Sequence, residues 1–584
     1  MDTVSGTTRN QIILHHNSAS QWLCFDNPFQ VVDARRIEDV LPALKYIEAQ
    51  VNEHGRYAAG FLSYEAAGAF DPAYYTRKAG DFPLLWFGLY PPPQEIQLPD
   101  PDYGAYSLAN KIPSLSQPEY FDAISKIKDH IYCGDTYQVN FTFQLKIPFD
   151  GDAWNLFLAM VRAQSAGYAA WVDTGRFAVC CASPELFFNL EGNQLTCKPM
   201  KGTVKRGRTL HEDEMFARWL QNSEKNRAEN IMIVDMIRND LGRIAVAGSV
   251  EVDRLFQVER HPTLWQMTST IRAKSEKSLT GIISALFPCA SITGAPKVRT
   301  TRIIADLERS ARNVYTGSIG FVGPGPRAQF NVAIRTAVVD REAGTASYGT
   351  GGGVVWDSGA QEEYTEAILK ARVLTEQRPD FSLLESLLWT RDNGYFLLDY
   401  HIRRLAESAQ YFDFPVNFKA VKESLYEKAS AFYDNRKKVR LLIDRDGCIE
   451  IQSSPIIPES LTKKLKVKLA SCPVHSHDIF LYHKTTYRHA YETAQQICTD
   501  CDDVLLWNER QELTESCVAN IVVQMDGALY TPPISSGLLA GVFRGWLLDQ
   551  GRIQERLLHV SDLKNCTKIY LVNSVRKWQE AVLK

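Results

Sequence analysis

The stretch Thr196-Cys197-Lys198-Pro199-Met200-Lys201-Gly202-Thr203 lies among alternating apolar runs, and these runs predict the fold class. Two runs before it, Phe177–Cys181 and Leu186–Leu190, have the length and composition of β-strands. After it, Glu224–Arg238 carries apolar side chains at helical spacing and is followed by Asn239-Asp240-Leu241-Gly242, a typical helix end. Strands and helices that alternate along the chain predict an α/β (α+β) domain around this stretch.

Lys201 is the candidate nucleophile of this stretch. It precedes Gly202-Thr203, for which we predict a turn, and it follows the carboxyl of Glu185 by 16 residues. An amine that attacks and an acid that protonates the leaving oxygen suit displacement of a hydroxyl from an activated ring. A lysine before Gly-Thr is otherwise a solvated turn residue, so the stretch alone leaves both interpretations open.

The composition is that of a globular protein with several domains. A chain of 584 residues predicts more than one core, and its 45% hydrophobic and 23% charged residues are ordinary values. The net charge of −3 comes from scattered charges, so we expect no nucleic-acid partner and no anionic membrane surface. The first 30 residues lack the pattern of a signal peptide, and no window has the 18 uninterrupted apolar residues of a membrane span.

Cysteine usage predicts a reduced, cytoplasmic enzyme, because the 12 cysteines are spread along the chain without a disulfide-like framework. Only Cys498 and Cys501 have the spacing of metal ligands. A closed zinc site needs four ligands, and no second pair accompanies these two, so we do not expect zinc.

Four segments can be separated along the chain. Residues 1–115 mix short apolar runs with turns and end in a proline-rich loop, and residues 116–375 carry the α/β pattern. Residues 376–381 resemble a linker, and residues 382–584 have their own pattern of strands and helices. This last segment is long enough for a separate domain.

A glycine run, Gly349–Val355, contains Gly351, Gly352 and Gly353. Because glycine has no Cβ, its backbone N–H group can approach a ligand carboxylate closely. A flexible turn is the alternative interpretation of this run.

Next, Glu362 opens a predicted helix that continues through Lys370. Glu363, Glu366 and Lys370 fall on one face of this helix. Carboxylates on one face suit Mg²⁺, which prefers oxygen ligands, and Glu229 could add a carboxylate from the earlier helix. Ordinary exposed helix charges are the alternative.

Together these motifs resemble the chorismate-utilising enzymes, a family that includes the large subunits of anthranilate and aminodeoxychorismate synthases and the isochorismate and salicylate synthases. The resemblance covers residues 116–375, and residues 1–115 resemble the amino-terminal part of the same synthases. The following blocks carry it, in the order of the family: Gly134–Asn140, Ser183–Glu185, Lys201–Thr203, Glu229–Asp235 with Arg238–Asp240, Ser291–Lys297, Ile334–Thr336, and the glycine run with Glu363–Lys370. The family implies a large α/β sandwich-type synthase domain.

The resemblance implies how this site would hold one end of chorismate. Glu229 and Glu366 would bind Mg²⁺ directly, with Glu363 nearby, and the metal would hold the ring carboxylate. Lys370 and the backbone of Gly351–Gly353 would support the same carboxylate.

At the other end of chorismate, Arg335 and Tyr315 would bind the enolpyruvyl carboxylate, for which a forked guanidinium is suited. Ser291 would line the pocket between the two ends.

Two positions separate the branches of the family. Isochorismate and salicylate synthases use a lysine to activate water where this chain has Gln138, so water addition is disfavoured. Aminodeoxychorismate synthases carry lysine at the position of Lys201, where anthranilate synthases usually have a small residue. By resemblance, the Lys201 amine would attack C2, Glu185 would protonate the departing C4 hydroxyl, and ammonia would enter at C4 and expel the lysine.

Four features found among the relatives or their partner subunits are absent or left open. Gln266 stands near a position where anthranilate synthases carry a histidine, and Asn226 replaces a carboxylate of many relatives. Some relatives bind tryptophan in the region around Tyr64, and the sequence does not tell whether this chain does. A Gly-x-Cys-x-Gly nucleophile turn is also missing, so we expect ammonia from a separate glutamine amidotransferase subunit.

The segment 382–584 has a candidate site for pyridoxal 5′-phosphate. This aldehyde cofactor needs a lysine, an acid against the pyridine nitrogen, and donors for the phosphate. Lys484, Glu515, Arg404 and the backbone at Gly541-Val542 resemble this set in the fold-type IV pyridoxal phosphate enzymes. The first strands of a typical member are missing or supplied by the rest of the chain.

Fusion of the two segments predicts the product. The product of an aminodeoxychorismate synthase is the substrate of an aminodeoxychorismate lyase, so we expect synthesis of 4-aminobenzoate for folate, with pyruvate released. Two alternatives remain open at this point: an anthranilate-type synthase with an appended aminotransferase, and a synthase whose last segment is a scaffold that binds a glutaminase.

Overall fold

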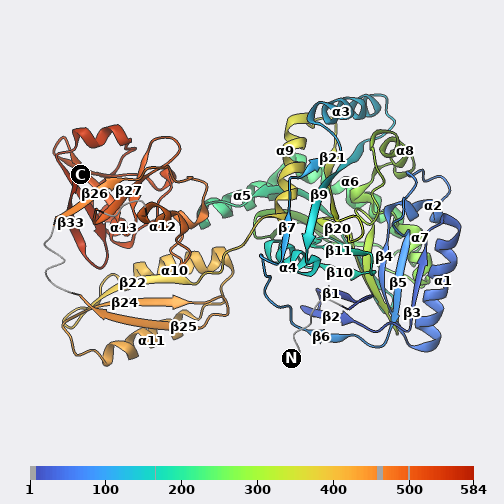
Figure 1. The fold of residues 1–584 in the computed structure, drawn as a ribbon, viewed down its shortest axis with the longest axis horizontal. Coiled ribbons are helices and arrows are strands. Elements are labelled where there is room, and N and C mark those ends of the chain that lie inside the picture. The colour runs from blue at the N-terminus through green and yellow to red at the C-terminus, as the bar shows by residue number, and fades with distance from the viewer. Residues whose placement is uncertain (1–7, 165, 457–463, 497–499) are drawn as a thin grey trace. The chain divides into compact units, whose positions relative to one another are not determined.

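The computed structural model describes residues 8–164, 166–456, 464–496 and 500–584, and Cys498 lies outside them. Contacts within the chain define two compact units (Figure 1). Unit 1 comprises Met1–Lys205 and Ala217–Arg378, and unit 2 comprises Arg206–Phe216 and Pro379–Lys584. Among the described residues, no helix combines the length and apolar character needed to cross a membrane.

Unit 1 contains two antiparallel sheets. The first has the order β17 (Gly294–Ala295), β9 (Gln138–Gly151), β21 (Thr345–Val354), β20 (Thr336–Asp340), β11 (Phe177–Cys181), β10 (Ala170–Asp173), β1 (Ile12–His16), β2 (Gln21–Phe25), β6 (Gln94–Ile96), with β7 (Tyr106–Leu108) and β8 (Ile112–Pro113) paired to β9. The second has the order β14 (Met200–Lys205), β16 (Leu264–Lys274), β13 (Gln194–Lys198), β12 (Leu186–Glu191), β19 (Arg327–Asn331), β18 (Ser318–Gly323), β4 (Tyr57–Leu62), β5 (Leu85–Tyr90), β3 (Gln30–Ala34), with β15 (Glu251–Arg260) paired to β16. Strands from residues 1–115 therefore belong to both sheets.

The two sheets of unit 1 pack face to face, and helices cover their outer faces (Figure 1). Alternate residues such as Ile12 and Leu14 on β1, and Ala59 and Phe61 on β4, form a buried core between the sheets. The second sheet packs on α1 (Ile37–His54), α6 (Glu224–Gly242) and α7 (Leu279–Leu286). The first sheet packs on α3 (Gln117–Tyr132), α4 (Ala153–Gln164), α8 (Lys297–Leu307) and α9 (Ala360–Lys370).

The predicted elements around the opening stretch are present. The two predicted strands are β11 and β12, and the predicted helix is α6. This helix begins after Ser223, whose hydroxyl accepts a hydrogen bond from the backbone N–H of Asn226 and so caps the first turn. The α/β (α+β) sandwich-type class is confirmed.

The predicted turn at Gly202-Thr203 is wrong, because these residues lie within strand β14. Met200 pairs with Thr268 and Thr203 pairs with Gln266, so β14 has one more residue than β16 over this interval. Gly202 accommodates the extra residue with a φ of 95°, which a residue with a Cβ rarely adopts. This β-bulge changes the direction in which Lys201 leaves the strand.

Unit 2 contains a small sheet and a larger one. The small sheet has the order β23 (Gly394–Tyr395), β22 (Leu383–Thr390), β24 (Arg436–Ile443), β25 (Ile449–Pro455), and it packs on α10 (Leu398–Phe412) and α11 (Phe418–Ser430). The large sheet has the order β28 (Leu513–Ser516), β27 (Asp503–Trp507), β26 (Leu465–Leu469), β33 (Lys577–Leu583), β32 (Lys568–Asn573), β29 (Asn520–Met525), β30 (Ala528–Thr531), β31 (Gln554–Glu555). Because β28 also pairs with β29, the first six of these strands close into a ring.

Two helices accompany the large sheet, α12 (His489–Gln496) and α13 (Val542–Asp549). The first residues of α5 (Leu210–Asn222) also belong to unit 2.

Candidate functional site

Lys201 lies in a largely buried position of unit 1, between α6 and β21. Its Nζ atom is 3.8 Å from Oε2 of Glu229, and its side chain is 14% exposed. A Cβ atom on Gly353 would lie 2.3 Å from Lys201 Nζ and 3.0 Å from Nε2 of Gln138. The lysine therefore has room only because residue 353 is a glycine.

The other glycines of the run have the same effect on their neighbours. They lie inside strand β21, so the alternative of a flexible turn is wrong. A Cβ on Gly352 would lie 3.0 Å from Oε2 of Glu363 and 3.6 Å from Nζ of Lys370. A Cβ on Gly349 would lie 2.2 Å from the ring of Tyr315. The strand thus presents bare backbone to the side chains predicted to form the site.

Glu185 is a buried acid next to Lys201 and Ser291. The hydroxyl of Ser291 donates a hydrogen bond of 2.7 Å to Oε1 of Glu185. Burial raises the pKa of Glu185 to about 7, although the Ser291 hydroxyl, the backbone of Met200 and the charge of Lys201 act to lower the pKa. A carboxyl with this pKa holds its proton for much of the time near neutral pH and can act as a general acid.

One face of α9 points to the same glycine strand. The Lys370 amine lies 2.8 Å from Oε1 of Glu366 and donates a hydrogen bond of 2.9 Å to the carbonyl of Gly351. The guanidinium of Arg335 donates to the carbonyl of Lys370 at 2.6 Å. Glu363, Glu366 and Lys370 therefore lie close together, as the spacing on the predicted helix requires, and Arg335 joins them through the carbonyl of Lys370.

The carboxylates predicted to bind Mg²⁺ do not form a metal cluster. In the described part of the chain, no group of three or more His, Cys, Asp or Glu side chains is placed to hold a metal ion. Glu229 lies beside Lys201, and Glu366 pairs with Lys370. The donor chemistry suits Mg²⁺, but here these carboxylates lie beside lysine amines.

The two departures from the family pattern hold the bulge of β14. Gln266 donates a hydrogen bond of 2.8 Å from Nε2 to the carbonyl of Gly202, and its Oε1 accepts one of 3.1 Å from the Thr203 hydroxyl. Asn226 lies against Gly202 and donates to Ser223 at 2.8 Å. Sequence reasoning missed these roles, because nothing local links residue 266 to residues 202 and 203.

A second candidate site lies in unit 2, around Lys484. Burial, with the charges of Arg404 and Arg488, lowers the pKa of the Lys484 amine to about 7, against the opposing effect of Glu385 and Glu515. An amine with this pKa is substantially neutral near pH 7, and a neutral amine can react with an aldehyde.

Glu515 lies on β28 and has three hydrogen-bond donors around its carboxyl. Oε1 accepts from the Tyr491 hydroxyl at 2.7 Å and from the backbone N–H of Leu539 at 3.0 Å, and Oε2 accepts from Asn520 at 3.2 Å. Burial raises the pKa of Glu515 to about 7. Tyr491 and Asn520 were missed from the sequence, where they are a helix residue and a strand residue without a distinguishing pattern.

Arg404 lies on α10 and is held by a buried acid. Its guanidinium donates to both carboxylate oxygens of Glu385, at 2.9 and 2.7 Å, and a third nitrogen donates to the carbonyl of Ala540 at 3.2 Å. Burial acts to raise the pKa of Glu385, but Arg404 and His401 outweigh burial and lower it to about 2. Sequence analysis missed Glu385, and an acid inside the otherwise apolar strand β22 is the signal that could have identified it.

Arg404 is thereby fixed beside the residues that begin α13. Gly541 is the N-cap of this helix and Val542 its first residue. A helix N-terminus and an adjacent guanidinium together suit a phosphate group. The amine, the buried carboxyl and this phosphate cradle match the groups that pyridoxal phosphate needs.

Comparison with known proteins gives the family of each part of the chain. The model of the chorismate binding enzyme family matches residues 9–376, and that of the class IV aminotransferases matches residues 382–582. Aminodeoxychorismate synthase component 1 of Salmonella typhimurium is 39% identical over 259 residues, which are 44% of this chain and 57% of that protein. The corresponding protein of Bacillus subtilis is 38% identical over 259 residues, which are 44% of this chain and 55% of that protein.

The aligned 259 residues thus span little more than half the length of the Salmonella typhimurium and Bacillus subtilis proteins. Among solved structures, anthranilate synthase component I of Streptococcus pneumoniae shares the fold of unit 1, with a TM-score of 0.53 and 22% identity, covering 64% of this chain and 94% of that one. Because the first family model matches more than half of the sequence, this chain belongs to the chorismate binding enzymes, and a class IV aminotransferase domain follows in the same polypeptide.

Proposed function

We propose that this chain makes 4-aminobenzoate from chorismate and ammonia in two steps, one in each unit. The observation that carries the proposal is the pairing in unit 1 of a lysine amine with a buried acid. Lys201 lies against Gly353, and Glu185, whose pKa is raised to about 7, experiences the charge of Lys201. An attacking amine and a proton donor are the two groups that hydroxyl displacement requires.

The first step is amination at C4 of chorismate. The Lys201 amine, after losing a proton, forms a bond to C2, both ring double bonds shift, and the C4 hydroxyl leaves as water with the proton of Glu185. Ammonia then bonds to C4, both double bonds shift back, the Lys201 amine leaves from C2, and the ammonium formed at C4 gives up a proton. The product is 4-amino-4-deoxychorismate, and Glu185 recovers a proton in the second displacement.

The chorismate carboxylates would be bound at opposite ends of this site. Lys370 and the backbone of Gly351–Gly353 suit the ring carboxylate, and Arg335 with Tyr315 suits the enolpyruvyl carboxylate. We also propose that Mg²⁺ neutralises the ring carboxylate. Glu229 and Glu366, with Glu363 nearby, would supply oxygen ligands after release from their lysine partners.

The second step takes place in unit 2 and removes pyruvate. Pyridoxal phosphate, when bound, supplies an electron sink for the carbon that carries the amino group. Lys484 would bind this cofactor, Glu515 would face its pyridine nitrogen, and Arg404 with Gly541 and Val542 would hold its phosphate. The Lys484 amine removes the proton at C4 and returns a proton to the departing enolpyruvate.

Ammonia would come from a partner. We propose a glutamine amidotransferase subunit, which fits the name component 1 of the relatives and the lack of a glutaminase nucleophile motif in this sequence.

Product analysis with one substitution tests the first step. Purified protein is mixed with chorismate, ammonium, Mg²⁺ and pyridoxal phosphate, and 4-aminobenzoate is the expected product. Lys201→Ala should lower its rate by at least about a hundredfold, because the covalent route is lost. The control is Lys205→Ala, on the same strand but exposed, which should stay within about twofold of wild type. A main product of 2-aminobenzoate, or full activity of Lys201→Ala, contradicts the proposal.

A further inference from the structure

Residues Arg206–Phe216, which we call the arm, belong to unit 2 although unit 1 supplies the sequence on both sides of them. The arm follows β14 directly and includes the first residues of α5. We propose that the arm is a positioning element for Lys484, because it fixes the two residues that precede this lysine. The inference rests on the function proposed above for Lys484.

The arm has a fixed shape because a buried ion pair joins its first residue, Arg206, to Asp213. The Arg206 guanidinium donates from Nε to both carboxylate oxygens of Asp213, at 2.7 and 2.9 Å. The backbone N–H of Gly207 donates to the same carboxylate at 2.8 Å. The two charged side chains are 7% and 1% exposed. A buried pair with this many hydrogen bonds resists opening, since a lone buried charge is strongly unfavourable.

The closed arm is bound to the end of α10 through Tyr411. Arg206 donates from Nη2 to the carbonyl of Tyr411 at 3.0 Å, and the Tyr411 hydroxyl donates to the carbonyl of Gly207 at 2.7 Å. The Arg206 guanidinium also lies 4.5 Å from the centre of the Tyr411 ring. These contacts hold the arm against the helix that carries Arg404.

From this place the arm fixes His483, the residue before Lys484. His483 Nε2 is 3.2 Å from the carbonyl oxygen of Arg208, and Nδ1 is 3.0 Å from the Ser408 hydroxyl. A carbonyl only accepts, so Nε2 carries the hydrogen and Nδ1 accepts from Ser408. Burial lowers the pKa of His483 to about 3, which keeps the ring neutral and preserves this arrangement.

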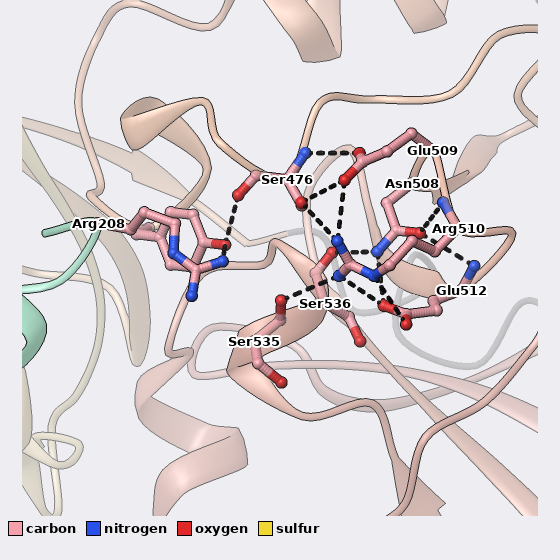
Figure 2. Close-up of polar contacts among 9 residues, drawn as sticks. Arg208, Ser476, Asn508, Glu509, Arg510, Glu512, Ser535 and Ser536 are labelled. Carbon is pink, nitrogen blue, oxygen red and sulfur yellow. Dashed lines mark hydrogen bonds and ion pairs between the residues drawn. The ribbon is translucent and has the colours of Figure 1, made fainter. Parts of the chain in front are cut away.

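The arm also fixes Tyr482, two residues before Lys484. Arg208 donates from Nη1 to the Tyr482 hydroxyl at 3.2 Å, and that hydroxyl donates to the carbonyl of Ser476 at 2.7 Å. The Ser476 hydroxyl donates to Glu509 at 2.5 Å and accepts from Arg510 at 2.9 Å. Figure 2 shows this chain of contacts, which runs from Arg208 to Arg510.

The far end of the same network leads to Glu515. Arg510 donates to both carboxylate oxygens of Glu512, at 2.9 and 2.8 Å, and Asn508 donates to Glu512 at 2.7 Å (Figure 2). Glu512 directly precedes β28, the strand that carries Glu515. One hydrogen-bonded network therefore connects the arm, the loop before Lys484 and the turn before Glu515.

The test uses hydrogen–deuterium exchange of the full chain without added cofactor. In Arg208→Ala, amides in residues 476–488 should exchange at least about fivefold faster than in wild type, because the Tyr482 hydroxyl loses the hydrogen bond from Arg208. Tyr482→Phe should give at least this increase, because it also removes the hydrogen bond to the Ser476 carbonyl, and the double variant should add nothing to the effect of Tyr482→Phe. Arg208→Lys should recover part of the protection. The control is His211→Ala, an exposed residue of the same arm.

Titration of the same proteins with pyridoxal phosphate, followed by absorbance, should show about tenfold weaker binding in Arg208→Ala than in His211→Ala. Equal exchange in Arg208→Ala and His211→Ala, or additive effects in the double variant, overturns the arm as a positioning element. If exchange changes as expected but wild type takes up no cofactor, the proposed function of unit 2 fails and the arm stands. If wild type binds the cofactor and exchange is unaffected in Arg208→Ala, only the role proposed for the arm is contradicted.

Discussion

Glu185 combines two requirements of an acid catalyst, a proton at neutral pH and a fixed orientation. Glu185 lines a small cavity together with apolar residues such as Leu186, Phe187 and Ile237, and its burial disfavours the charged form. The hydrogen bond from the Ser291 hydroxyl to Oε1 fixes the orientation of the carboxyl group. The same residue therefore links the packing of the core to the chemistry of the site.

The pKa of Glu185 predicts a pH dependence for amination. Because burial raises the pKa to about 7, the protonated fraction falls from about 0.9 at pH 6 to about 0.1 at pH 8. At constant free ammonia and saturating chorismate, the rate should decline about tenfold for each pH unit well above 7. Glu185→Gln should lack this decline and should be slower by about 10²- to 10⁴-fold at pH 6.

A second variant, Ser291→Ala, should change the pH at which the amination rate declines. The Ser291 hydroxyl lowers the pKa of Glu185 by stabilising the carboxylate. Without it, the decline should move to higher pH, and the pH–rate profile measures this directly. A decline that persists unchanged in Glu185→Gln shows that another group is titrating.

At the scale of elements, the glycine strand β21 is the surface on which the first site is built. Alternate strand residues face opposite sides of a sheet, yet Gly352 and Gly353 both leave room for functional side chains. Lys201 and Gln138 lie next to Gly353, and Glu363 and Lys370 lie next to Gly352. A strand of larger residues would fill this space.

Gly353→Ala should therefore disable the first site selectively. The added methyl would lie 2.3 Å from Lys201 Nζ, so the amine must move. A displacement of about 1 Å is expected to lower the amination rate by about a hundredfold, while cofactor uptake by unit 2 stays unchanged. The control is Gly242→Ala at the end of α6, where a Cβ meets nothing within 4 Å. Comparable losses in both variants would refute a local effect.

Regular elements were predictable because their signals are local. The apolar spacing of α6 and the runs of β11 and β12 lie within the elements themselves. The bulge at Gly202 was not, because glycine followed by threonine is as typical of a turn as of a bulge. Pairing with β16, more than 60 residues later in sequence, decides between them. The grouping of Glu363, Glu366 and Lys370 followed from helix spacing alone.

At the scale of the molecule, two units with separate lysines predict separable activities. Lys484→Ala should still consume chorismate and ammonia but should accumulate 4-amino-4-deoxychorismate, because the proposed release of pyruvate takes place in unit 2. Lys201→Ala should form neither product. A mixture of the two variants should produce 4-aminobenzoate after a lag, as the intermediate passes through solution, and liquid chromatography measures both compounds.

The double variant Lys201→Ala/Lys484→Ala is the control, and it should be inactive in every mixture with Lys201→Ala. Formation of 4-aminobenzoate by Lys484→Ala alone would show that unit 2 is not the lyase.

The sequence could not predict that the arm belongs to unit 2, because its partners Tyr411 and Tyr482 lie some 200 or more residues later.

Because unit 2 is assembled from two stretches of chain, its integrity has a topological consequence. A protease that cuts once near residue 378 would divide the chain into two fragments. Eleven residues of unit 2, 206–216, would remain in the fragment that contains unit 1. Release of a complete unit would need three scissions. Gene fission at that point would likewise yield a second protein that lacks part of its own fold, which favours the inheritance of both units on a single polypeptide.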